Sequence, residues 1–281
     1  MSPAASLFAL ARPAMLPFLL LLPALGYGWG HWEHRLDLYA PGRFLWTLPA
    51  WTLVHAGTLW LNAALDRDQE EVLFGRAVEV PTQAARLGLL ALALAVPLAA
   101  QASTLSALAA AGCGLLAIAY SHPRLRLKAR PLAGPLINAL GYGLLSPLAG
   151  WAALELPARP GSALVLPLLP LGLLAPFFVA QVHQEEADRS RGYRTLVVTH
   201  GPQACVRAAS LALALALAWG LLLIPLGLAP PRTALGALAW LGVILWLERQ
   251  RPRAAQAGSQ LAQGLVLRMA LATVLTIALV A

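Results

Sequence analysis

Long apolar runs alternate with short charged stretches along the whole chain. Crossing the hydrocarbon core of a bilayer takes about 20 residues, and nine runs approach or reach that length: 14–30, 44–65, 84–101, 103–121, 132–154, 162–182, 205–228, 232–248 and 261–281. The runs are rich in Leu and Ala, which favour helices, and they lack the apolar–polar alternation of barrel strands. The pattern predicts an all-α polytopic membrane protein, a bundle of nine transmembrane helices forming a single domain over residues 1–281.

The composition supports a lipid environment. Hydrophobic residues make up 59% of the chain and charged residues 11%, whereas a soluble globular domain carries about 25% charged residues. The formal net charge of +8 does not indicate nucleic acid binding, because the basic residues flank the apolar runs. The lipid bilayer is therefore the expected partner, and nucleic acid is not.

The charged connections give the expected orientation. Those after the second, fourth, sixth and eighth runs are 66–83, 122–131, 183–204 and 249–260, and with their flanks they hold 14 of the 20 basic residues. Basic connections face the cytoplasm in most membrane proteins. We therefore expect the acidic and basic loops, and the N-terminus, on the cytoplasmic side.

The acidic residues gather in two of these connections, and topology does not account for them. The first group follows the second run in the stretch WLNAALDRDQEEVLFGRA, where Asn62, Asp66 and Glu70 are spaced i, i+4, i+8 and share one helix face. The second group follows the sixth run in VHQEEADRSRGYRTLVVTHG, where Glu185 and Asp188 are three residues apart. Gly192 is the residue expected to end that helical stretch.

This residue set predicts a magnesium–phosphate site. Mg²⁺ prefers oxygen ligands and is often completed by substrate phosphates, and arginine and lysine bind the same phosphates. The metal-ligand candidates are Asn62, Asp66, Glu70, Glu185 and Asp188. The phosphate-binding candidates include Arg67, Arg189, Arg194 and the segment RLRLKAR at 124–130, with Arg126 and Lys128. A site of this kind at the membrane implies a lipid phosphate as substrate.

Four segments, in order, resemble the UbiA-type intramembrane prenyltransferases: LNAALDRDQEE, YSHPRLRLKARP, GYGLLSPLAGW and QEEADRSRGYRTLVVTHG. The resemblance covers nearly the whole chain and implies nine helices, Mg²⁺ as cofactor and an isoprenyl diphosphate as donor. It implies catalytic roles for Asp66 and Asp188, and substrate binding by Asn62, Arg67, Tyr120, Arg126, Lys128, Arg189 and Arg194. The sequence departs from the family pattern at Ala63 and Gln184, where the family usually has Asp, and at Glu70, where Glu replaces Asp.

The expected reaction is transfer of an isoprenyl group to a hydrophobic acceptor: an aromatic, quinone-like, tetrapyrrole, carotenoid or lipid molecule. Two alternatives stay open. A transporter or lipid-binding membrane protein would use the same charges for an ion or substrate path. A non-catalytic family member would fit the departures at Ala63 and Gln184. His55, inside the second run, is a candidate for lining an acceptor pocket, with a structural role as the alternative.

Overall fold

The structure is a computed structural model that describes residues 1–66 and 78–280. Within these two ranges every regular element is a helix, which confirms the all-α prediction. Five described stretches are long and apolar enough to cross a membrane: Pro3–His34, Thr104–Ser121, Ser162–His183, Pro202–Leu223 and Thr233–Leu279. The last stretch contains two successive helices, so these five stretches are not a count of crossings. The predicted number of nine is not confirmed.

The chain forms two compact units, residues 1–127 with 140–158 and residues 128–139 with 159–281. The first unit contains α1 (Pro3–Leu10), a 3₁₀ turn (Pro13–Met15), α2 (Leu16–His34), α3 (Pro41–Asp66), α4 (Ala84–Ala100), α5 (Thr104–Ser121) and α7 (Ser146–Ala152). A 3₁₀ turn (Leu127–Ala129) and a π-helical segment (Ala139–Leu145) lie where the chain passes between the units.

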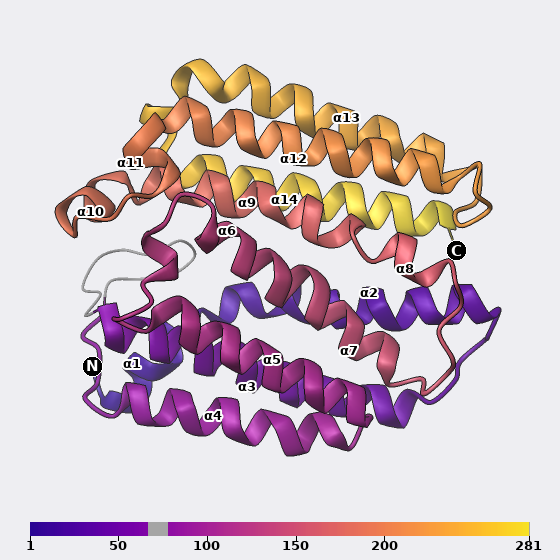
Figure 1. Ribbon diagram of the computed structural model, residues 1–281, viewed down its shortest axis with the longest axis horizontal. Helices are drawn as coiled ribbons and strands as arrows, with labels where there is room; N and C mark the ends of the chain where they lie inside the picture. Colours follow the sequence, from indigo (N-terminus) through magenta and orange to yellow (C-terminus); the bar gives the residue numbers. More distant parts are fainter. Residues whose placement is uncertain (67–77, 281) are drawn as a thin grey trace. The chain divides into compact units, whose positions relative to one another are not determined.

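The second unit contains the remaining helices (Figure 1). These are α6 (Ala133–Asn138), α8 (Ser162–Val165), α9 (Leu168–His183), α10 (Glu185–Ser190), α11 (Leu196–His200), α12 (Pro202–Leu223), α13 (Thr233–Gln250), a 3₁₀ turn (Arg251–Arg253) and α14 (Ala254–Val280). Each predicted run thus coincides with one helix or with two or three consecutive helical segments.

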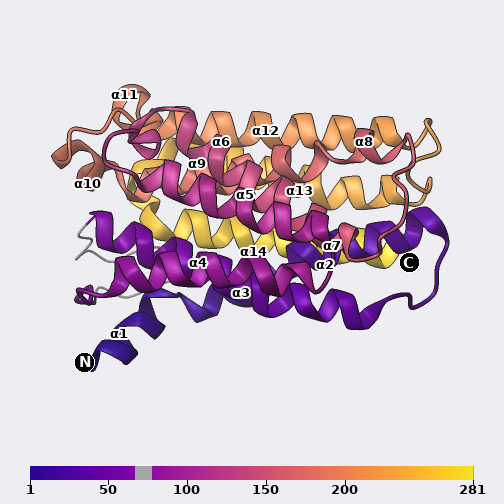
Figure 2. The same cartoon turned by 60° about the horizontal axis from the view of Figure 1, so that its bottom comes forward.

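Small residues allow the helices of the first unit to approach closely. Its buried core is rich in alanine, with Trp51 and Val54 of α3 among alanines of α3, α4, α5 and α7. The helices α3 and α4 lie side by side in both views (Figure 1, Figure 2). A Cβ atom on Gly57 would lie 2.8 Å from the carbonyl oxygen of Gly88, and one on Gly88 would lie 2.9 Å from that of Gly57. This contact, typical of membrane helices, fixes the helix that carries Asn62 and Asp66.

In the second unit α9 packs against α12 and α14, and α13 packs against α12 and α14. At the charged end, Val182, Val197 and Cys205 form a buried cluster. They come from α9, α11 and α12, so this cluster joins the ends of three helices. It supports the short segment between α9 and α12, which contains the second acidic group.

Candidate functional site

The first acidic group begins at the C-terminal end of α3. Asn62 and Asp66 are both partly buried there, one helical turn apart. The hydroxyl of Ser121, the last residue of α5, donates a hydrogen bond of 3.1 Å to Oδ1 of Asn62. Tyr120 precedes Ser121 on α5. The structure therefore joins the segment LNAALD to the segment YSHP within the first unit, although 59 residues separate Asn62 from Ser121.

Two predicted site residues lie outside the described residues. These are Arg67, the candidate phosphate-binding residue, and Glu70, the third member of the i, i+4, i+8 series. Their roles stay predictions.

The second acidic group lies on α10, a single short helix. The backbone leaves helical geometry at Gln184, between α9 and α10, and the amide of Asp188 then donates to the carbonyl of Gln184 at 2.8 Å. At the other end, Gly192 has φ +68°. The amides of Gly192 and Tyr193 donate to the carbonyls of Arg189 and Asp188, at 3.1 and 2.8 Å. This is a Schellman ending, and it confirms the prediction that the helical stretch stops at Gly192.

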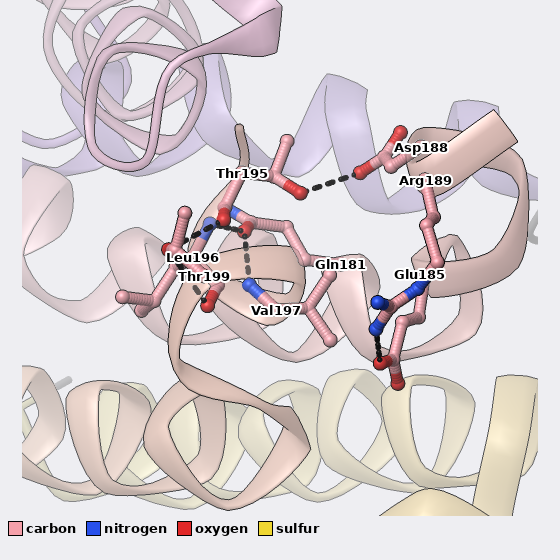
Figure 3. Close-up of polar contacts among 8 residues, drawn as sticks. All are labelled: Gln181, Glu185, Asp188, Arg189, Thr195, Leu196, Val197 and Thr199. Atoms are coloured by element: carbon pink, nitrogen blue, oxygen red, sulfur yellow. Dashed lines mark hydrogen bonds and ion pairs between the residues drawn. The ribbon is translucent and has the colours of Figure 1, made fainter. Parts of the chain in front are cut away.

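Asp188 is 6% exposed, and its position is fixed from a neighbouring segment. The hydroxyl of Thr195 donates to its Oδ2 at 2.8 Å (Figure 3). Thr195 is itself the residue that precedes α11, whose first amides, of Leu196 and Val197, donate to Oε1 of Gln181 at 2.9 and 3.4 Å. A buried side chain of α9 thus caps α11, and Thr195, the residue before α11, holds the carboxylate of Asp188 on α10.

Glu185 takes a different direction. Its carboxylate forms an ion pair with the guanidinium of Arg189, one turn later on α10, with 2.8 Å between Oε1 and Nη2. Both side chains are partly exposed, at 31% and 64%, so this pair contributes little to stability. Figure 3 shows Glu185 directed toward Arg189 and Asp188 directed toward Thr195. The two predicted metal ligands on α10, Glu185 and Asp188, are therefore not directed at each other in this structure.

Lys128 supplies positive charge beside Asp188. Burial and the charge of Arg191 lower the pKa of Lys128 from 10.5 to about 8, and the carboxylate of Asp188 opposes this shift. The neighbouring backbone is fixed to the same region, because the amide of Arg194 donates to the carbonyl of Ala129 at 2.9 Å. The structure thus joins the last three residues of the segment RLRLKAR, 128–130, to the second acidic segment within the second unit.

Arg126 has a different local environment. Its φ of +44° lies in the left-handed region, which costs energy for a residue with a side chain. Its Nε donates to the carbonyl of Pro123 at 3.0 Å, and its side chain is exposed. Its expected role in phosphate binding stays a prediction.

The oxygen chemistry of these residues fits Mg²⁺. Within residues 1–66 and 78–280, no three His, Cys, Asp or Glu side chains lie close enough together to hold a metal ion. Mg²⁺ is, however, commonly held by one or two carboxylates together with waters and substrate phosphates. Buried Asp188, with a lysine and arginines nearby, suits an ion that arrives with a phosphorylated substrate.

Sequence reasoning missed three polar residues within or beside the apolar runs. Gln181 lies within the sixth apolar run, and its position there was the available signal. Arg12, before the second helix, places its guanidinium within electrostatic range of His55 and Tyr142. Arg268, within the last apolar run, is the third.

His55 is 5% exposed, and neither ring nitrogen makes a hydrogen bond of ordinary geometry to a described residue, although the backbone of Ala11 is close. Its place in an acceptor pocket stays a prediction.

The chain is similar to known proteins over nearly its full length. A sequence model of the UbiA prenyltransferase family matches residues 14–272. A structure of a UbiA homolog from Archaeoglobus fulgidus bound to DMAPP and Mg²⁺ is similar with a TM-score of 0.73 and 18% identity, over 98% of this chain and 99% of that one. The same homolog bound to GPP and Mg²⁺ gives a TM-score of 0.68, 18% identity and the same coverage.

A digeranylgeranylglyceryl phosphate synthase is similar with a TM-score of 0.69 and 15% identity, over 100% of this chain and 98% of that one. A comparison with curated protein sequences gave no match. At these identities the structural similarities establish the fold.

Proposed function

Because this chain belongs to the UbiA prenyltransferase family, we propose that it transfers an isoprenyl group from a prenyl diphosphate to a hydrophobic acceptor, with Mg²⁺ as cofactor. The observation that carries the proposal is the surroundings of Asp188. A buried carboxylate is held by Thr195, next to Lys128 and within a segment that carries several arginines. Acidic and basic groups placed together at the charged end of a membrane helix suit a metal-bound diphosphate.

The magnesium proposal has support from relatives. The Archaeoglobus fulgidus homolog has been solved with DMAPP and Mg²⁺ and with GPP and Mg²⁺. In this chain Asp66 and Asp188 would hold the ion, with Asn62, Glu70 and Glu185 as the further candidates. When bound, Mg²⁺ stabilises negative charge on phosphate oxygens.

The residues of the chain supply the remaining chemistry. Lys128 and Arg194 bind the diphosphate of the donor, with Arg67, Arg126, Arg189 and Tyr120 as further candidates. The bond between the allylic carbon and the diphosphate oxygen breaks, and its electron pair leaves with the diphosphate. Positive charge around the leaving group lowers the cost of this separation. The acceptor then donates an electron pair to the allylic cation and loses a proton, so that atoms and charge balance.

We further propose that the two acidic segments act on one diphosphate, and that both units belong to one catalytic domain of nine membrane-spanning helices. The excess of basic residues in alternate connections supports a cytoplasmic location for these segments. The acceptor belongs to one of the expected hydrophobic classes: aromatic, quinone-like, tetrapyrrole, carotenoid or lipid. Apolar side chains dominate the chain, which fits such a molecule but does not select among the classes.

Replacing either of the two proposed catalytic carboxylates, those of Asp66 and Asp188, by an amide tests the proposal. Asp66→Asn and Asp188→Asn keep the shape of the side chain and, at position 188, an oxygen that can accept from Thr195. We expect each variant to release diphosphate from a labelled prenyl diphosphate at least about 100-fold more slowly, the scale of losing one charge-stabilising group. Asp37→Asn, an exposed acid outside the two segments, is the matched control and should match the unmodified protein.

Two results would count against the assignment. Activity within about tenfold of the unmodified protein in both variants would show that these carboxylates are not essential, since a group of this kind contributes more. If the purified protein consumes no prenyl diphosphate at any magnesium concentration tested, the result would favour the non-catalytic or transport alternative.

A further inference from the structure

Arg268 is a charged residue in the interior of an apolar helix. It lies ten residues after Gly258, where the backbone of α14 departs from helical geometry (φ +49°, ψ −134°), and twelve before the end of the helix at Val280. Its side chain is exposed, and the adjacent Leu267 and Leu271 are 63% and 60% exposed. Exposed leucines of this kind mark a surface that faces lipid, where an arginine is costly and usually functional.

The side chain of Arg268 is held in one orientation. Its Nη1 donates to the carbonyl of Gly264, one turn earlier, at 3.0 Å. The centre of the guanidinium lies 4.0 Å from the ring centroid of Trp246 on α13. A Cβ on Gly264 would lie 3.3 Å from both Nη1 and the indole ring. The glycine therefore leaves the space in which guanidinium and indole stack between α13 and α14.

This orientation turns the charge toward the charged end of the second unit. Side chains that reach back along a helix toward the interface are the usual solution for arginine in lipid. Trp246 lies four residues before the end of α13 at Gln250, so the stack lies about one turn inside the end of that helix. The exposed Arg249 and Arg253 lie at the same end.

No anion within the described part of the chain balances Arg268. It contacts a neutral carbonyl and an aromatic ring, and no described acid forms an ion pair with it. Glu248, the single acid between Thr233 and Val280, is paired with Arg251 at 2.8 Å. The same stretch contains four arginines. An anion that pairs with Arg268 would therefore come from outside the described part of the chain.

We propose that Arg268 and Trp246 form a binding site for the phosphate of an anionic phospholipid, on the surface where α13 and α14 pack together. A guanidinium matches a phosphate in planar, two-pronged geometry. A tryptophan beside it is typical of the interface between lipid and water. The leucines on either side accept acyl chains, and Arg249 and Arg253 attract negatively charged headgroups to this end of the unit. This site is separate from the acidic segments of the proposed reaction.

Native mass spectrometry of the full-length protein tests the site. The detergent-purified protein is incubated with phosphatidylglycerol or, in a parallel sample, with zwitterionic phosphatidylcholine at the same concentration. We expect bound phosphatidylglycerol in the first sample, much lower occupancy by phosphatidylcholine in the second, and an at least fivefold lower phosphatidylglycerol occupancy in Arg268→Gln. Trp246→Leu should also lower the occupancy, and it keeps the test available if Arg268→Gln does not fold.

Arg207→Gln is the matched control. Arg207 is an exposed arginine near the start of α12, in the same unit, without an aromatic ring among its described contacts. This variant should keep phosphatidylglycerol occupancy within twofold of the unmodified protein. Equal occupancy in the unmodified protein and Arg268→Gln, or an equal loss in Arg207→Gln, overturns the proposal. A dimer that dissociates in Arg268→Gln without loss of lipid also overturns it, in favour of contact with a second copy.

Discussion

Lys128 and Asp188 carry opposite charges close together, and this combination suits the region to bind a phosphorylated ligand. The lysine is partly buried and lies within electrostatic range of Arg191, so burial and like charge lower its pKa to about 8. Asp188 partly offsets this cost. A diphosphate would add negative charge beside Lys128 and restore its preference for the protonated form.

This arrangement predicts a pH dependence for donor binding. Below a pH of about 8 Lys128 carries its proton and attracts the diphosphate; as the pH rises through that value the charge is lost, and donor affinity should fall. A diphosphate is already fully ionised there, because the last phosphate pKa is about 6. The KM for the donor should therefore rise several-fold between about pH 7 and about pH 9.

Lys128→Arg is the control for this assignment. An arginine stays protonated over the whole range, so its donor KM should remain nearly constant with pH. If the variant and the unmodified protein show the same profile, another group causes the dependence and Lys128 does not contact the donor.

At the scale of elements, the second acidic segment depends on where a short helix starts and stops. The sequence predicted its end at Gly192, because glycine adopts positive φ without steric cost, and the structure confirms it. The spacing of acids could not predict the start. The break at Gln184 turns Glu185 toward Arg189 and leaves Asp188 facing Thr195, seven residues away. Contacts of this kind depend on tertiary structure, which helical periodicity does not contain.

Substitution of Gly192 should therefore affect the site through the backbone. A Cβ there meets no atom within 4 Å, so the cost of Gly192→Ala comes from its φ of +68° alone. We expect a loss of about 1 kcal/mol in the local stability of α10, the scale for alanine in left-handed geometry. Because α10 carries Asp188, the magnesium concentration for half-maximal activity should rise.

Gly172→Ala is the matched comparison, since that glycine lies within α9, has ordinary helical geometry and also leaves open space for a Cβ. Alanine favours helices over glycine, so this variant should keep the thermal midpoint and the magnesium requirement. Equal magnesium dependence in the two variants would show that the ending of α10 does not position Asp188.

At the scale of the whole molecule, hydrophobicity alone established the helical class and the approximate limits of most helices. The predicted run 84–101 agrees with α4, and 103–121 agrees with α5. The interruptions were not predictable in the same way. The run 132–154 contains a π-helical segment at Ala139–Leu145, where an extra residue per turn leaves no mark in hydropathy. The isolated charge of Arg268 also escaped notice, because averaging over the run 261–281 hides a single arginine.

The alternation of charged and nearly uncharged connections predicts on which side each one lies, and cysteine labelling in intact cells tests it. Single cysteines at the exposed positions Arg124 and Arg253 mark the charged connections, and those at Arg159 and Leu226 mark the others. The two native cysteines are buried and would be replaced by serine. If the basic connections face the cytoplasm as predicted, a membrane-impermeant maleimide should label positions 159 and 226 alone in intact cells, and all four positions after the cells are opened. Labelling of 124 or 253 in intact cells would contradict both the orientation and the cytoplasmic location of the acidic segments.

An odd number of crossings, such as nine, requires the two termini to lie on opposite sides of the membrane. With the N-terminus in the cytoplasm, a cysteine tag after Ala281 should therefore be labelled from outside, whereas one before Met1 should not.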